Sequence, residues 1–177
     1  MKPESPTERP AAVHPSVARR LAAMVYEALI VAAILLAAGL LYSLAAGGIV
    51  EGGLRLAFQA YLVAVLGLYF VWCWRRGRTL AMRAWHLRVV REDGRPLSTG
   101  QAALRFVLAA LTLGTGSLGL IAVWKAPYSW GAWAAVAAGL LTVAWAWFDR
   151  DGQFLHDRLA RTRLVLVKEA RKPRAAA

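Results

Sequence analysis

The sequence predicts an all-α integral membrane protein with four transmembrane helices and a small cytoplasmic β element. The first observation is composition: the 177 residues are 59% apolar and only 18% charged, whereas soluble domains are about 45–50% apolar and about 25% charged. The second is that the apolar residues gather in four runs near the roughly 20 residues that cross a bilayer as a helix. The third is that the basic residues lie almost entirely outside these runs.

The four predicted spans are residues 17–46, 54–74, 104–124 and 130–148, within one membrane domain over residues 16–168. The first span follows Ser16, a suitable N-cap, and it is too long for a secretory signal, whose apolar core has about 7–15 residues. The second ends in Trp72, Trp74 and then Arg75-Arg76. This order is typical of an aromatic belt followed by cationic anchors at the membrane surface.

The distribution of basic residues predicts the orientation. The formal net charge is +12, and all but two of the 22 Lys and Arg lie in residues 1–20, 75–105 and 149–177; the exceptions are Arg55 and Lys125. Because basic residues favour the cytoplasmic side, both termini and the loop 75–103 are expected there. We expect anionic lipid headgroups as partners, at about 1 kcal/mol per basic residue. Nucleic acid is not expected, because no basic module interleaved with aromatic residues is present.

The segments outside the spans follow from local patterns. Residues 1–15 are rich in proline and are expected to form a disordered cytoplasmic tail, and residues 169–177 form a basic C-terminal tail. Residues 86–91 and 95–97 flank Asp93-Gly94, which predicts a hairpin, and the alternating residues 162–167 are expected to join it in a small sheet.

Two further helical features are expected around the loop. Residues 77–84 are predicted to lie in the membrane interface, with Leu80, Met82 and Trp85 towards lipid. Ser98 or Thr99 is expected to cap a short helix that leads into the third span. That span is rich in small and hydroxylated residues, which indicates either a seam between packed helices or a broken helix that lines a ligand site.

Glu27 is the main candidate functional residue, since it is the one ionisable group deep in the first span. It lies seven residues beyond Arg20, on the same helix face and about 10 Å deeper. An unpaired carboxylate there costs on the order of 2–3 kcal/mol. Glu27 is therefore expected either to bind a proton or cation, tuned by Arg20, or to form a structural ion pair. Arg105, at the start of the third span, is a second candidate partner.

A second acidic candidate follows the fourth span, in the segment FDRDGQFLHDRLA. His156-Asp157 is expected to begin a short helix, with Asp157 capping backbone N–H groups, pairing with Arg83 or Arg88, or serving a site. The three histidines match no zinc spacing, and no residue has the setting of a nucleophile or acid–base pair. We expect no metal, no cofactor and no enzymatic activity. Cys73 is the only cysteine, so no internal disulfide can form.

Three stretches together resemble the RDD family of bacterial inner-membrane proteins: SVARRLAAMVYEALI, RTLAMRAWHLRVVREDGRPLSTGQAALR and FDRDGQFLHDRLARTRLVLV. The resemblance runs from Ser16 to Val167. It implies that Arg19 or Arg20 matches the family's arginine, at the start of the first helix. Glu27 stands where the family has its first aspartate, which keeps the charge and moves the carboxylate by one methylene. Asp157 is the best match for the second aspartate.

The resemblance implies a multi-pass protein of the bacterial inner membrane. It also implies transport of ligands not yet identified, with sodium/proton exchange suggested for some members. Because four spans are few to enclose a pathway, we expect a homo-oligomer or a membrane partner protein. The alternative is a non-transporting scaffold or accessory protein that binds anionic lipid or a membrane partner.

Overall fold

The computed structural model describes residues 15–48 and 52–167. The predicted tails at residues 1–15 and 169–177, apart from Pro15, lie outside the described residues, as do residues 49–51 of the first outer loop. Four long apolar helices are candidate membrane spans, and a two-stranded sheet accompanies them. The predicted fold class is confirmed.

Three of the four spans match the predicted bounds to within one residue at each end, whereas the third begins five residues before the predicted residue 104. The four spans are α1 (Val17–Ala45), α2 (Gly53–Arg75), the third span Thr99–Lys125, and α6 (Trp130–Phe148). The third span comprises α4 (Thr99–Ala109), a π-helical turn η1 (Ala110–Gly114) and α5 (Thr115–Lys125). It begins at Thr99 because the Ser98 side chain accepts a hydrogen bond from Gln101 N and caps the helix there.

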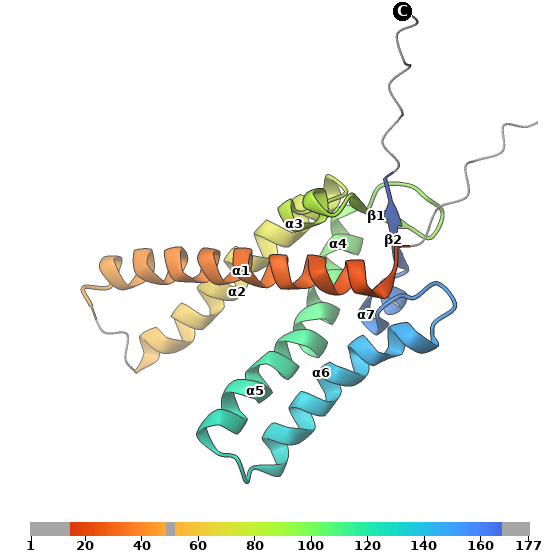
Figure 1. The fold of residues 1–177 in the computed structure, drawn as a ribbon. Helices are drawn as coiled ribbons and strands as arrows, with labels where there is room; N and C mark the ends of the chain where they lie inside the picture. The colour runs from red at the N-terminus through yellow and green to blue at the C-terminus, as the bar shows by residue number, and fades with distance from the viewer. Residues whose placement is uncertain (1–14, 49–51, 168–177) are drawn as a thin grey trace, which may run out of the picture.

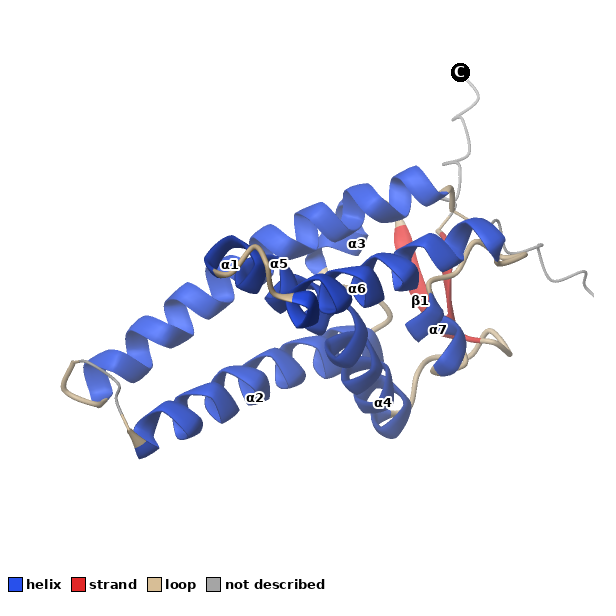
Figure 2. Ribbon diagram, turned by 90° about the horizontal axis from the view of Figure 1, so that it is seen from below, coloured by secondary structure: helices blue, strands red, loops and turns tan. Residues whose placement is uncertain are grey.

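The remaining elements gather at one end of the molecule, which we call the sheet end. They are α3 (Leu80–Ala84), β1 (Leu87–Arg91), α7 (Leu155–Leu159) and β2 (Thr162–Leu166). By chain order, α1 and α4 begin at this end, and α2 and α6 end there. Figure 2 shows both strands beside the ends of the long helices.

The sheet pairs segments distant in sequence. Strand β1 is antiparallel to β2, with Leu87 opposite Leu166 and Arg91 opposite Thr162, so the prediction that residues 162–167 join the sheet is confirmed. The predicted hairpin arm at residues 95–97 is wrong, since these residues are not a strand. Arg91 N does donate to Arg95 O at 2.9 Å, but Pro96 has no N–H to continue a ladder.

The main hydrophobic core lies at the sheet end. Its buried residues come from α1, α2, both strands, the β1–α4 loop and α4: Ala23, Trp74, Leu87, Val89, Leu97, Ala102 and Leu164. The long helices otherwise expose mostly apolar side chains, as helices surrounded by lipid do. Figure 1 shows the α1–α2 pair and the α5–α6 pair diverging away from the sheet end.

Helix α3 confirms only part of its prediction. Thr79 caps it by accepting from Met82 N, and Leu80 is 64% exposed, as an interfacial residue should be. Met82 and Trp85, expected to face lipid, instead pack against the hydrophobic core. The core reaches them because α3 leads directly into β1, which is buried within it.

The small residues of the third span form a packing seam with α6. A Cβ atom at Gly116 would lie 2.7 Å from Gly139 Cα, and one at Gly119 would lie 2.8 Å from Val136 N. The hydroxyls of Thr112, Thr115 and Ser117 donate to carbonyls of their own helix. The span passes through a π turn without a break, which favours the seam over the ligand-lining broken helix.

Candidate functional site

Helix α1 presents two polar groups to the rest of the protein. Arg20 and Glu27 lie two helical turns apart, about 10 Å along the axis. Arg20 is buried at the sheet end, whereas Glu27 is partly buried farther into the span. The two side chains contact different partners, so α1 carries two separate polar centres.

The first centre is the Glu27 carboxylate with two hydroxyl donors. Tyr69 Oη, from α2, donates to Glu27 Oε1 at 2.8 Å, and Thr79 Oγ1 donates to Glu27 Oε2. Thr79 is fully buried, and the same hydroxyl accepts from Met82 N. Each carboxylate oxygen therefore has one neutral donor, and the centre joins α1 to α2 and to the start of α3.

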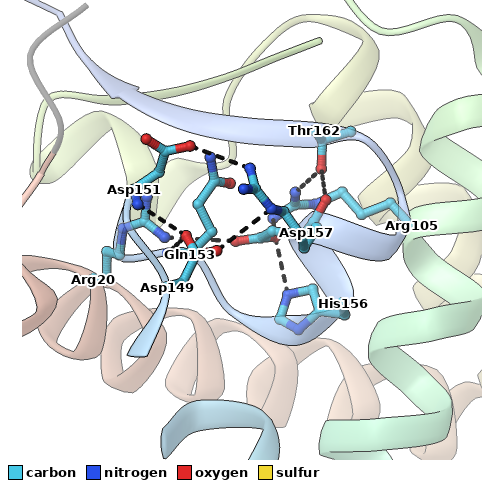
Figure 3. Close-up of polar contacts among 9 residues, drawn as sticks. Arg20, Arg105, Asp149, Asp151, Gln153, His156, Asp157 and Thr162 are labelled. Atoms are coloured by element: carbon cyan, nitrogen blue, oxygen red, sulfur yellow. Dashed lines mark hydrogen bonds and ion pairs between the residues drawn. The ribbon is translucent and has the colours of Figure 1, made fainter. Parts of the chain in front are cut away.

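The second centre is the Asp157 carboxylate, which contacts two arginines from two spans. Arg105 Nη2, from α4, lies 2.6 Å from Asp157 Oδ1, and Arg20 Nη1, from α1, lies 3.7 Å from Oδ2. His156 Nε2 is 3.2 Å from Oδ1. All four side chains are buried, and Figure 3 shows them converging on Asp157.

The two arginines differ in the number of hydrogen bonds and ring contacts that their guanidinium groups make. Arg105 Nη1 donates to Thr162 Oγ1 at 2.6 Å, Thr162 Oγ1 donates to Asp157 O, and the Arg105 guanidinium lies over the Trp74 ring. In the described part of the chain, no nitrogen of the Arg20 guanidinium has a hydrogen-bond partner. Arg20 is therefore held by charge and by the ring of Phe154, whose centroid lies 5.8 Å from its Cζ.

An outer layer of charged residues closes the cluster on the α6–α7 loop. Asp149 Oδ2 accepts from the backbone N of Asp151 and of Gln153, which folds the loop back on itself. Arg158 pairs with Asp149 at 3.4 Å and with Asp151 at 3.2 Å. These contacts position α7, and with it Asp157, against the ends of α1 and α4.

Asp157 is held in its ionised form. Burial by itself raises the pKa of this carboxyl, but the charge of Arg105, followed by His156 and Arg20, outweighs burial and leaves the pKa well below its usual range. Because the lowered pKa favours the ionised carboxylate, which then takes up no proton, the Asp157 cluster is suited to joining helices. The Glu27 centre, whose donors are neutral, is suited to exchanging a proton or cation.

The structure corrects the predicted pairings. Glu27 was expected either to bind a proton or cation or to form an ion pair with Arg20 or Arg105, and only the ion pair is ruled out, because both guanidinium groups lie at Asp157. The ion-pair prediction failed because Arg20 is two turns nearer the sheet end, where α7 supplies a closer carboxylate. Asp157 was expected to cap backbone N–H groups, to pair with Arg83 or Arg88, or to serve a site; it pairs with these span arginines instead of a loop arginine.

Arg19, the alternative match for the family's arginine, is exposed, and its backbone N donates to Ser16 Oγ at the helix start. Of the two neighbouring arginines, Arg20 is thus the one that reaches the cluster.

Sequence reasoning missed the donors to Glu27. Tyr69 carries a hydroxyl group within a largely apolar span, and Thr79 follows the basic end of that span. These two positions were the sequence signals that could have indicated donors to Glu27. Sequence reasoning also missed the hydrogen bond from Arg105 to Thr162. The position of Thr162 in the last strand does not indicate an arginine partner. In the described residues, no three His, Cys, Asp or Glu side chains lie together as a metal site would require.

The fold and the two centres define a multi-pass membrane protein whose helices are joined at one end by a buried arginine–aspartate cluster. A family model described as the RDD family matches residues 14–161. The chain therefore belongs to the RDD family. No curated protein and no solved structure matches it.

Proposed function

We propose that this RDD protein is a transporter, or a subunit of a transport complex, in which Glu27 binds and releases a proton or a small cation. The observation that carries the proposal is the setting of this carboxylate. It lies within a span and accepts hydrogen bonds from two neutral hydroxyls, and no basic side chain pairs with it in the described residues.

Charge balance at Glu27 supports the proposal. An ionised carboxylate in a span costs on the order of 2–3 kcal/mol unless it is compensated, and two hydroxyl donors lower this cost without supplying positive charge. Arg20 and Arg105, the two arginines that the sequence offered as partners of Glu27, pair with Asp157 instead. The charge of Glu27 is therefore left to be met by a proton or by a bound cation, and either can exchange.

The membrane and the assembly belong to the same proposal. Basic residues flank the sheet end and are sparse at the other end, which supports a cytoplasmic sheet end in a bacterial inner membrane. The long helices bury few residues within one chain. A second copy or a partner subunit would complete the walls of a pathway.

The test is cation-driven proton exchange in proteoliposomes that contain a pH-sensitive dye. Sodium and potassium gradients are applied in separate experiments to the parent and to Glu27→Gln. Gln keeps the shape, accepts one of the two hydroxyl hydrogen bonds through its amide oxygen and can donate to the other hydroxyl through its NH2 group. We therefore expect near-parental folding with exchange reduced at least tenfold.

The matched control is Asp93→Asn, which removes one carboxylate from the exposed β1–α4 loop and should leave exchange unchanged. Parental exchange in Glu27→Gln would remove Glu27 from the mechanism. Absence of exchange in the parent with both gradients would contradict exchange of these cations altogether.

A second candidate is a non-transporting scaffold or accessory protein. It is favoured by the hydroxyls of the third span, which bond their own helix instead of lining a polar path. In that case Glu27→Gln would change only stability or assembly, and a stoichiometric membrane partner would co-purify with the parent.

A further inference from the structure

Four arginines gather where α2 turns into α3. Arg75 ends α2, Arg76 and Arg78 follow in the turn, and Arg88 comes from β1. We call these four residues the arginine corner. They belong neither to the Glu27 centre nor to the Asp157 cluster.

Gly77 allows Arg88 to join the other three arginines. Its φ is +88°, and a Cβ atom there would lie 2.8 Å from Arg88 Nε and 3.3 Å from Arg88 Cγ. The Arg88 side chain therefore lies across the bare backbone of Gly77, between the positions of Arg76 and Arg78. Val89 N donates to Gly77 O at 2.7 Å, which fixes β1 to the turn.

The arginine corner is exposed and has no acidic partner in the described residues. Neighbouring arginines behave differently: Arg91 and Arg95 both lie 3.9 Å from Asp93. Arg75, Arg76 and Arg78 lie within four consecutive residues and the Arg88 side chain contacts Gly77 among them, so their like charges repel one another and a bound anion relieves that repulsion.

The surroundings of the corner indicate which anion binds. Trp72 is 57% exposed one turn before the end of α2, and the Arg76 guanidinium stacks on its ring at 3.8 Å. Leu80, just beyond Arg78, is 64% exposed. Apolar surface directly beside clustered arginines fits an amphiphile, whose acyl chains cover Trp72 and Leu80 while its phosphate meets the guanidinium groups.

We propose that the arginine corner is a binding site for the phosphate headgroup of an anionic phospholipid. The proposal goes beyond the exchange proposed for Glu27 and does not depend on it, because a lipid can occupy this site whether or not the protein transports anything. Gly77 is part of the site, since it gives Arg88 its place.

The experiment measures lipid binding to the purified full-length protein by native mass spectrometry, with added phosphatidylglycerol and, separately, phosphatidylcholine. We expect phosphatidylglycerol to bind the parent more tightly. The double substitution R76Q/R78Q should weaken phosphatidylglycerol binding at least tenfold. The control R91Q/R95Q removes two arginines from the end of β1 and the β1–α4 loop and should change binding less than threefold.

A third variant separates placement from charge. Gly77→Ala keeps every arginine but crowds Arg88 and disfavours the positive φ, so it should also weaken phosphatidylglycerol binding. Parental binding by R76Q/R78Q, or an equal loss in R91Q/R95Q, would overturn the site. Displacement of the lipid by equimolar inorganic phosphate would overturn the assignment to a lipid.

Discussion

Asp157 is the acidic residue through which α7 meets two membrane spans. Its carboxylate is buried with two guanidinium groups, and the closer one, from Arg105, also has a hydroxyl acceptor in Thr162. The Arg20 guanidinium lies near the negative charge of Asp157, but in the described residues it has no hydrogen-bond acceptor. Removing the carboxylate would therefore leave two buried cations, one of them without any hydrogen bond.

We predict that Asp157→Asn destabilises the protein strongly. Breaking a buried ion pair by removing one partner costs about 3–5 kcal/mol, because the other charge stays buried and uncompensated. The measurement is unfolding in mixed micelles as a function of denaturing detergent. Asp93→Asn, which removes an exposed carboxylate, should cost about 0–1 kcal/mol.

The pH dependence provides a check on this interpretation. Since the folded-state pKa of Asp157 is lowered, its contribution to stability is complete above the ordinary aspartate pKa of about 4 and is lost as the pH falls below that value. Asp157→Asn should lack this part of the acid sensitivity. An Asn variant as stable as the parent at pH 7 would show that the cluster does not join the helices.

At the scale of elements, the packing of α5 against α6 depends on three glycines, Gly116, Gly119 and Gly139. The backbones of Gly116 and Gly139 approach so closely that neither position has room for a methyl group without a shift of backbone. Close approach through small residues is a recurrent way of packing helices in lipid, where the hydrophobic effect between helices is absent.

We predict that Gly139→Ala separates α5 from α6 and destabilises the protein by on the order of 1–3 kcal/mol, the usual cost of overpacking. Gly131→Ala, in the same helix, meets only Ser129 Oγ at 4.0 Å and should be neutral. Detergent-induced unfolding of the two variants, measured side by side, tests the difference. Equal stability of both would mean that the helices can shift apart without loss.

The bounds of a helix could be predicted from the sequence where one local feature determines them. The length of an apolar run fixed α6 exactly as observed and α1 to within one residue, and Ser16 and Ser98 gave helix starts through their caps. The hairpin arm failed at the edge of β1 away from β2, where Val89 N donates to Gly77 O and Pro96 has no N–H to pair. The contact with Gly77 comes from a turn twelve residues earlier, so the pattern around Asp93-Gly94 does not reveal it.

At the scale of the molecule, the sequence singled out the charged residues of the two centres, but it did not predict which of them contact one another. Arg20, Glu27, Arg105 and Asp157 stand out because charge is rare in or beside apolar spans. Their pairing depends on how the spans pack at the sheet end. Glu27 meets donors 42 and 52 residues away, and nothing near Glu27 in the chain distinguishes these two hydroxyls from others.

The orientation of the whole protein yields the last prediction. In a Cys73→Ala background, single cysteines replace Tyr128, which is 94% exposed in the α5–α6 turn, or Glu92, which is exposed beside β1 at the sheet end. Since the basic residues cluster at the sheet end, we expect a membrane-impermeant thiol reagent applied to intact bacteria to label the cysteine at 128 and not the one at 92. Both should react once the membrane is permeabilised. Labelling of position 92 alone in intact cells would reverse the topology and place the Asp157 cluster and the arginine corner at the outer face.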